Sequence, residues 1–115
     1  MSNFQEIITK DLDSLQDEVD AERHALLKLR FRQATDQLKD YSQLKKTRHK
    51  IAQLLTAINF HKRAIAVAKK IPQIERTISK QPYTSKAEFQ YDENIWMVSF
   101  HNNDGEQLET VKVKL

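Results

Sequence analysis

The chain has 115 residues, 30% of them charged and 39% hydrophobic, which is too polar for a large core and too apolar for a disordered chain. It contains no cysteine, so disulfides, thiolate nucleophiles and cysteine-ligated zinc are excluded. Its apolar runs are only a few residues long and its first residues lack the features of a signal peptide, so we expect a soluble protein without a membrane span.

The net charge of +3 conceals an uneven distribution along the chain. Residues 41–80 carry ten Lys/Arg and one Asp/Glu, whereas residues 1–40 carry six and nine, and residues 81–115 carry three and six. A strongly basic segment with acidic flanks is typical of a region that binds a polyanion. The alternative is a solvated lysine-rich helix face, and we favour nucleic acid over it because clustered positive charge is the footprint of phosphate binding.

The first long helix is predicted from its cap and its apolar spacing. Ser14 and Asp17 form a capping-box pattern, and the acidic residues after Ser14 complement the positive end of a helix. The helix is expected to fade near Lys39. Apolar residues at helical spacing predict one stripe along it: Leu15, Val19, Leu26, Leu27, Phe31, Ala34 and Leu38. For Phe31 we favour packing in this core over stacking on a nucleobase.

A second helix follows after a single short turn. Asp40 is a suitable cap, with Gln43 at the reciprocal position. The helix should end by Ile71, because a residue before proline resists the helical conformation. Its apolar face is predicted to comprise Leu44, Ile51, Leu54, Leu55, Ile58 and Ile65. So short a connection requires the two helices to fold back antiparallel, with their apolar stripes facing each other.

The period of the hydrophobic pattern changes after Pro72. This proline is suited to open a short third helix. Over about residues 86–114, apolar and polar residues alternate, and Asn102–Gly105 is the strongest turn signal in the chain. These features predict a three-stranded antiparallel β meander whose apolar face packs on the helices or on another molecule. The expected fold class is mostly α, with a long antiparallel two-helix hairpin followed by a small C-terminal antiparallel β meander.

No active site or metal site is expected. The four histidines are His24, His49, His61 and His101, and no two have the three- or four-residue spacing of a helical metal site. We therefore interpret them as exposed or RNA-facing polar residues. The single glycine cannot form a phosphate-cradling loop. We expect a protein that is not an enzyme, with no catalytic residues, no cofactor and no metal.

Three segments, in matching order and spacing, resemble a known family. Residues 29–38 (Leu-Arg-Phe-Arg-Gln-Ala-Thr-Asp-Gln-Leu) are similar to the end of the first helix in large-subunit ribosomal protein twenty-nine of bacterial-type ribosomes. Residues 10–18 resemble the opening of that family, and residues 47–56 resemble its second helix. The similarity covers about residues 10–62. One departure is Asp36, which stands where the family has glycine; we expect aspartate to tolerate the left-handed conformation there at modest cost.

The resemblance implies a structural constituent of the large ribosomal subunit. It implies docking on large-subunit ribosomal RNA near the exit of the peptide tunnel, beside ribosomal protein twenty-three, in the bacterial cytoplasm or in an organelle with bacterial-type ribosomes. We expect residues 1–71 to form the ribosomal hairpin and residues 72–115 to form an extension. The acidic balance of the extension favours another ribosomal protein as its partner over RNA. The alternative function is a coiled-coil protein-interaction adaptor outside the ribosome.

The predicted RNA-binding residues gather at the turn between the two helices. Arginines precede the turn and lysines follow it, so both groups converge at one end of the hairpin, where neutral side chains add donors for sugar or phosphate oxygens. Further basic residues lie along the second helix. The predicted set is Arg30, Arg32, Gln33, Thr35, Gln37, Lys45, Lys46, Arg48, Lys50, Lys62 and Arg63.

Overall fold

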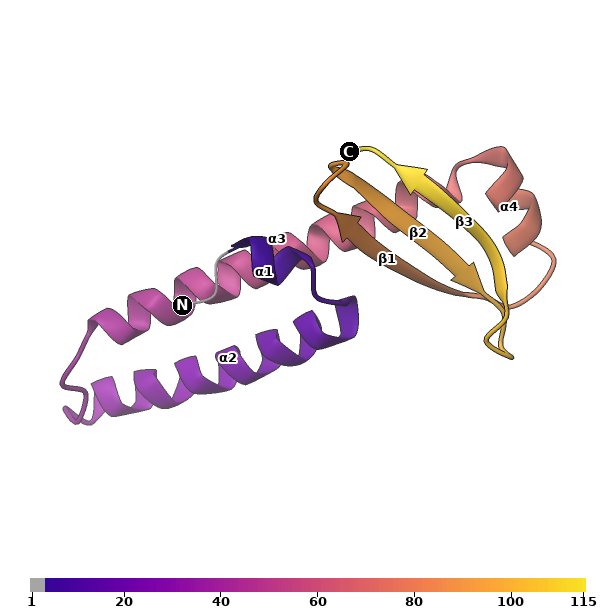
Figure 1. Cartoon of the computed structure of the whole chain (residues 1–115). Coiled ribbons are helices and arrows are strands. Elements are labelled where there is room, and N and C mark those ends of the chain that lie inside the picture. Colours follow the sequence, from indigo (N-terminus) through magenta and orange to yellow (C-terminus); the bar gives the residue numbers. More distant parts are fainter. Residues whose placement is uncertain (1–3) are drawn as a thin grey trace.

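The computed structural model describes residues 4–115, in which a long helical hairpin leads into a small sheet (Figure 1). The helices are α1 (Phe4–Ile8), α2 (Leu12–Ala34), α3 (Ser42–Lys69) and α4 (Pro72–Ile78). The strands are β1 (Thr84–Gln90), β2 (Ile95–His101) and β3 (Gln107–Val113). The predicted fold class, a two-helix hairpin followed by a small antiparallel meander, is confirmed. No helix in this part of the chain is both long enough and apolar enough to cross a membrane.

The ends of α2 differ from the prediction. Asp11, not Ser14, caps the helix, because the Asp11 carboxylate accepts a hydrogen bond from the backbone N–H of Ser14 at 3.0 Å. The predicted capping box of Ser14 with Asp17 was therefore wrong. At the other end α2 stops at Ala34, well before Lys39, because Asp36 takes a left-handed conformation with φ 62°. This outcome agrees with the tolerance expected of an aspartate at the position of the family glycine.

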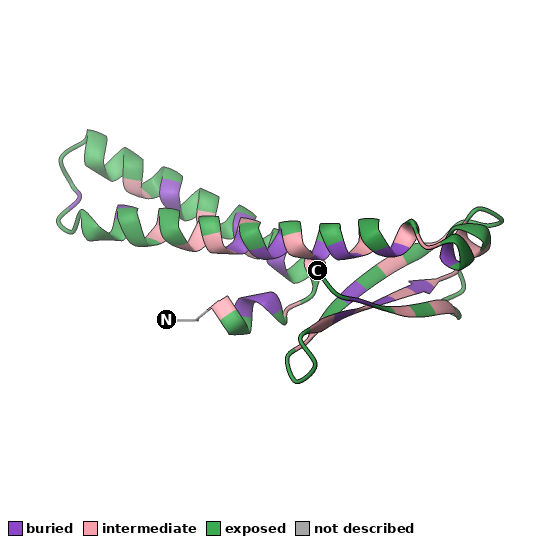
Figure 2. Ribbon diagram, turned by 90° about the horizontal axis from the view of Figure 1, so that it is seen from above, coloured by how far each residue is buried: buried purple, intermediate pink, exposed green. Residues whose placement is uncertain are grey.

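The hairpin is held together by one narrow apolar seam. From α2 it buries Leu15, Val19 and Leu26, and from α3 it buries Leu44, Leu54 and Ile58. The short helix α1, which was not predicted, adds the fully buried Ile7 against Leu15 and Leu54. Toward the turn the seam thins to Leu26, Leu38 and Leu44, so most residues there are exposed (Figure 2).

The sheet is a meander in the order β1-β2-β3, with antiparallel pairing throughout. Its second turn follows the predicted signal. Gly105 has φ 87°, and the side-chain oxygen of Asn102 accepts hydrogen bonds from the backbone N–H groups of Asp104 and Glu106. Alternate residues of the central strand β2 are buried, so the sheet has one apolar face.

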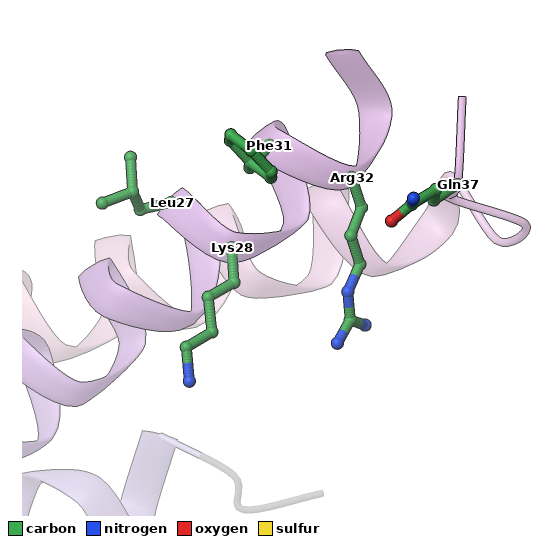
Figure 3. A pocket seen from close by; sticks show the side chains of 5 residues that line it. All are labelled: Leu27, Lys28, Phe31, Arg32 and Gln37. Carbon is green, nitrogen blue, oxygen red and sulfur yellow. The ribbon is translucent and has the colours of Figure 1, made fainter. Parts of the chain in front are cut away.

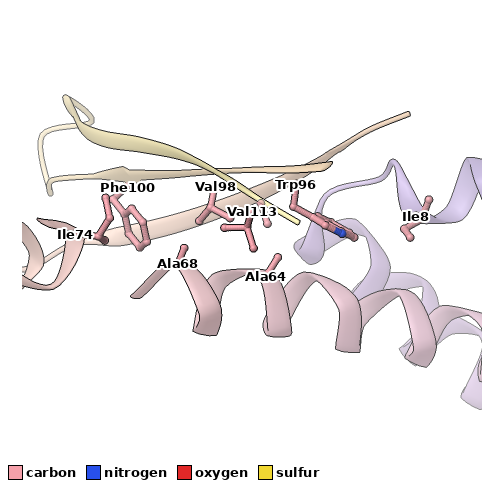
Figure 4. Packing of buried hydrophobic residues seen from close by; sticks show 9 residues of the cluster. Ile8, Ala64, Ala68, Ile74, Trp96, Val98, Phe100 and Val113 are labelled. Atoms are coloured by element: carbon pink, nitrogen blue, oxygen red, sulfur yellow. The ribbon is translucent and has the colours of Figure 1, made fainter. Parts of the chain in front are cut away.

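The apolar face of the sheet packs on the C-terminal part of α3. Trp96, Val98 and Phe100 of β2 lie over Ala64 and Ala68 of α3, with α4 closing the far end (Figure 4). Of the two possibilities that the sequence left open, packing on the helices is therefore the one observed. The helix α3 contacts α2 along its first part and the sheet along its last part, so the hairpin and the sheet share one helix.

His61 is buried where α1, α3 and the sheet meet, with only 1% of its surface exposed. Its Nε2 donates to the carbonyl oxygen of Ile8 at 3.2 Å, and its ring meets Trp96 edge to face with centroids 4.7 Å apart. Its Nδ1 has no hydrogen-bond partner among the described residues. The interpretation of all four histidines as exposed or RNA-facing was thus wrong for His61. His61 follows the buried Ile58 by three residues, a spacing that places both on one face of the helix. This spacing could have predicted the burial of His61.

Burial in this core lowers the pKa of His61 from its ordinary value of 6.5. The carbonyl oxygen of Ile8 and the charge of Asp11 act in the opposite direction and offset part of the shift. The unfolded chain therefore binds a proton at this residue at a higher pH than the folded chain does. The contribution of neutral His61 to stability is present above pH 6.5 and is lost as the pH falls toward the lowered pKa.

We therefore expect the free energy of unfolding to decrease between about pH 7.5 and about pH 5.5, and to decrease less in a His61→Gln variant, whose amide does not titrate. Urea denaturation at a series of pH values measures both. His101→Gln is the matched control, because it makes the same substitution at a partly buried position in β2. Equal pH dependence in the wild type and in His61→Gln would contradict the assignment.

Candidate nucleic-acid interface

The turn between α2 and α3 is held at both of its ends. At the end of α2, the backbone N–H of Asp36 donates to the carbonyl of Gln33 at 3.2 Å, and that of Gln37 donates to the carbonyl of Arg32 at 2.8 Å. This pair of bonds is a Schellman motif, which needs a left-handed residue at the position of Asp36. The turn therefore has a defined path that sets where its side chains point.

Asp40 holds the start of α3, but Tyr41, not the predicted Asp40, is the N-cap residue, and Tyr41 makes no side-chain cap bond. The Oδ1 of Asp40 accepts hydrogen bonds from the backbone N–H of Ser42 at 3.0 Å and from the Ser42 hydroxyl at 2.6 Å. These bonds lower the pKa of Asp40, so its carboxylate stays charged next to the positive end of α3. Between the two ends of the turn, Leu38 is buried in the apolar seam and anchors the turn to it.

Five exposed cations on the two helices flank this turn, and exposed Lys39 lies within it. We call these five residues the turn-end basic cluster; they are Arg30, Arg32, Lys45, Lys46 and Arg48. Within residues 4–115 none of the five forms an ion pair or a side-chain hydrogen bond. Two carboxylates, Asp36 and Asp40, also lie in the turn, and Lys46 acts weakly on the carboxylate of Asp40. The structure thus brings together, at one end of the hairpin, cations that the chain itself leaves uncompensated.

Two of the predicted residues near the turn are already engaged within the protein. Lys50 forms an ion pair with Glu22 of α2, with Nζ and Oε1 3.3 Å apart, so it bridges the two helices. The Thr35 hydroxyl donates to the carbonyl oxygen of Phe31 at 3.1 Å as part of the helix end. A donor role for Thr35 toward RNA would require that bond to break. Gln33 and Gln37 are exposed.

Lys62 and Arg63 lie outside the turn-end basic cluster. The 16 residues from Lys46 to Lys62 correspond to about 24 Å of helix. Both side chains are exposed. Lys62 borders a shallow groove between α2 and α3, where Asp20 and Arg23 also lie. These two residues therefore form a separate basic region on the second part of α3.

Phe31 and Leu27 are exposed, contrary to the predicted core position. Leu27 is 64% exposed and Phe31 is 69% exposed, and both line a shallow hollow on α2 with Lys28, Arg32 and Gln37 (Figure 3). The predicted apolar stripe was too wide, because this end of α2 packs on α3 alone and buries only the narrow face that contains Leu26. Within the described residues, no three His, Asp or Glu side chains are arranged to hold a metal ion.

The described residues form an antiparallel helical hairpin with exposed cations at its turn, and the hairpin segment is similar to a known protein family. The model of the Ribosomal L29 protein family matches residues 5–60, which comprise α1, α2 and most of α3. Residues 5–60, just under half of the chain, are thus similar to the ribosomal L29 family. No solved structure shows significant similarity to the chain.

A curated relative shows the same similarity. The large ribosomal subunit protein uL29 of Crocosphaera subtropica is 48% identical over 44 residues. These residues are 38% of this chain and 56% of the relative, so the chain spans little more than half the length of that protein. The sheet lies outside the segment that the family model matches.

The left-handed residue at the turn leads to a stability prediction. We expect Asp36→Gly to raise the free energy of unfolding by about 1 kcal/mol, because glycine adopts a positive φ without a Cβ clash. Asp36→Val should lower it, since a β-branched residue resists that conformation. Urea denaturation measures both changes. The control is Asp104→Gly, at a turn position without a positive φ, where no gain is expected; a less stable Asp36→Gly protein would contradict the turn geometry.

Proposed function

We propose that this chain is a structural constituent of the large ribosomal subunit and binds large-subunit ribosomal RNA through the turn end of the hairpin. The observation that carries this proposal is the turn-end basic cluster, whose five exposed cations lack acidic partners and lie in the segment matched by the L29 family model. Exposed, uncompensated cations gathered on one surface are what phosphate binding requires.

The chemistry of the cluster suits recognition of folded RNA by its backbone. Arg30, Arg32 and Arg48 present planar guanidinium groups that grip phosphates with two hydrogen bonds, and the lysines act as point charges. The Schellman motif and the hydrogen bonds from Ser42 to Asp40 hold these groups in a defined arrangement. Such a surface reads the shape and phosphate spacing of an RNA more than its base sequence.

We extend the proposal to the position that the family resemblance implies, near the exit of the peptide tunnel and beside ribosomal protein twenty-three. In this proposal residues 1–71 form the ribosomal hairpin, and residues 72–115 form an extension that is supported by α3. Because the apolar face of the sheet is covered by α3, a neighbouring ribosomal protein would contact its outer face or an edge strand. Lys62 and Arg63 would provide a second, more distant RNA contact. No catalytic role is proposed.

The alternative is a coiled-coil adaptor that acts outside the ribosome. Adaptors of that kind alternate both signs of charge along their helices and pair them across the interface. Here Glu22 and Lys50 form the one ion pair between α2 and α3 in residues 4–115, and residues 30–48 carry six Lys/Arg against two Asp. This distribution favours a polyanionic partner over a second helical protein.

Replacing two lysines of the cluster tests the RNA contact. We expect Lys45→Ala with Lys46→Ala to weaken binding to purified large-subunit ribosomal RNA. We also expect the slope of log affinity against log salt to become shallower by about 1.5, because two phosphate contacts and their released counterions are lost. Equilibrium binding at several salt concentrations measures both quantities.

The matched control is Lys80→Ala with Lys114→Ala. It removes the same charge from two exposed positions that follow α4 and β3. The control should keep the wild-type slope. If the two double variants lower the slope equally, binding depends on net charge alone, and the turn end is not the contact surface.

A further inference from the structure

The outer face of α2 carries an apolar pair that the fold does not use. Phe31 and Leu27 are the two most exposed large hydrophobic side chains in residues 4–115, at 69% and 64%. They lie four residues apart and are therefore neighbours on one helix face. The seam with α3 lies on the opposite side, where Leu26 is buried. Neither exposed side chain contributes to holding the hairpin together, so their presence needs another explanation.

Cations border this apolar pair. Lys28 and Arg32 are also four residues apart, and their side chains extend from α2 in the same direction, away from the side on which Leu27 and Phe31 project (Figure 3). Together with Gln37 from the turn, all of these side chains line one shallow hollow. Within residues 4–115 neither Lys28 nor Arg32 has an acidic partner. The hollow therefore combines one exposed aromatic ring, two free cations and one amide.

The size of the apolar pair argues against a protein partner. A stable protein interface buries roughly 800 Å² on each side and has an apolar core of several residues surrounded by a polar rim. This face offers only Phe31 and Leu27 at its centre, with cations directly beside them. A single flat ring next to free cations suits a nucleotide, whose base stacks on the ring while its phosphates meet the charges. Arg32 also belongs to the turn-end basic cluster, so the hollow is continuous with the proposed RNA contact.

We propose that Phe31 is a stacking platform for one unpaired base of the RNA that the turn-end basic cluster binds. Leu27 widens the apolar floor, and Lys28 and Arg32 hold the phosphates next to that base. This inference rests on the proposed function and adds a second kind of contact to it. Phosphate contacts release counterions and depend on salt, whereas stacking does not. Stacking on Phe31 therefore contributes RNA affinity that persists when salt weakens the phosphate contacts of the turn-end basic cluster.

Substitutions of Phe31 in the full chain separate stacking from other contacts. With purified large-subunit ribosomal RNA as the probe, Phe31→Ala and Phe31→Leu should each reduce affinity about tenfold or more at every salt concentration, with the salt slope unchanged. Phe31→Trp should keep the wild-type affinity, because an indole also stacks. The leucine variant is decisive, since it keeps an apolar side chain but has no flat ring.

Fluorescence gives an independent readout of the same contact. The tryptophan in Phe31→Trp should be quenched when the RNA is added, because a stacked base quenches it. Trp96 in the wild type is 3% exposed and should not respond. Val67→Ala on α3 removes another exposed apolar side chain and should leave the RNA affinity unchanged. Phe31 and Val67, the two substituted positions, are both exposed, so urea denaturation should show wild-type stability for each variant.

The outcomes distinguish this inference from the proposed function. The wild type could bind the RNA with the expected salt dependence while Phe31→Leu binds as well as Phe31→Trp. That result would contradict stacking on Phe31 but would agree with RNA binding by the turn-end basic cluster. If Phe31→Ala keeps its RNA affinity but is lost from isolated large subunits, the hollow contacts a protein and the inference is wrong. If the wild type shows no salt-dependent binding at all, the proposed function and the platform fail together.

Discussion

The helix α3 is the packing partner on which the rest of the molecule depends. It buries the leucines of α2 along its first part, and near its end Ala64 and Ala68 receive the apolar face of the sheet. A single helix has too little surface to bury a wide face of both α2 and the sheet, so each of the two contacts is a narrow stripe. The consequence for function is that the outer face of α2 and the flanks of the turn remain free. The uncompensated cations and the exposed Phe31 both follow from this shared packing.

Periodicity and turn chemistry were sufficient to predict the hairpin, the short helix at Pro72 and the meander, because each of these elements depends on local spacing. The left-handed conformation of Asp36 was expected only from the family resemblance, which has glycine at this position, because apolar spacing alone had continued the helix to about Lys39. The features that were missed depend on contacts between distant segments. Burial of His61 requires α1 and the sheet to close over it, and exposure of Phe31 follows from how little of α2 a single partner can cover.

The candidate interface shows the same division. The sequence indicates where the positive charge lies, but not which polar side chains already have partners within the folded protein. Lys50 reaches Glu22 only because α2 and α3 are antiparallel with this register, and the Thr35 hydroxyl bonds to the Phe31 carbonyl because the backbone there is helical. The cluster that remains is smaller and more sharply located than the predicted set. The family match ends at residue 60 within α3, so the same helix that forms the family hairpin continues outward to carry the sheet.

The central claim is that the basic turn end attaches this chain to the large ribosomal subunit. Sedimentation of cell extract through a gradient at moderate salt, with detection of the full-length chain, tests it most directly. The chain should migrate with large subunits, and the Lys45→Ala with Lys46→Ala protein should be released from them at a lower salt concentration than the wild type. If the wild-type chain instead stays at the top of the gradient with other small proteins, it is not a ribosomal constituent, and an adaptor role outside the ribosome becomes the better account.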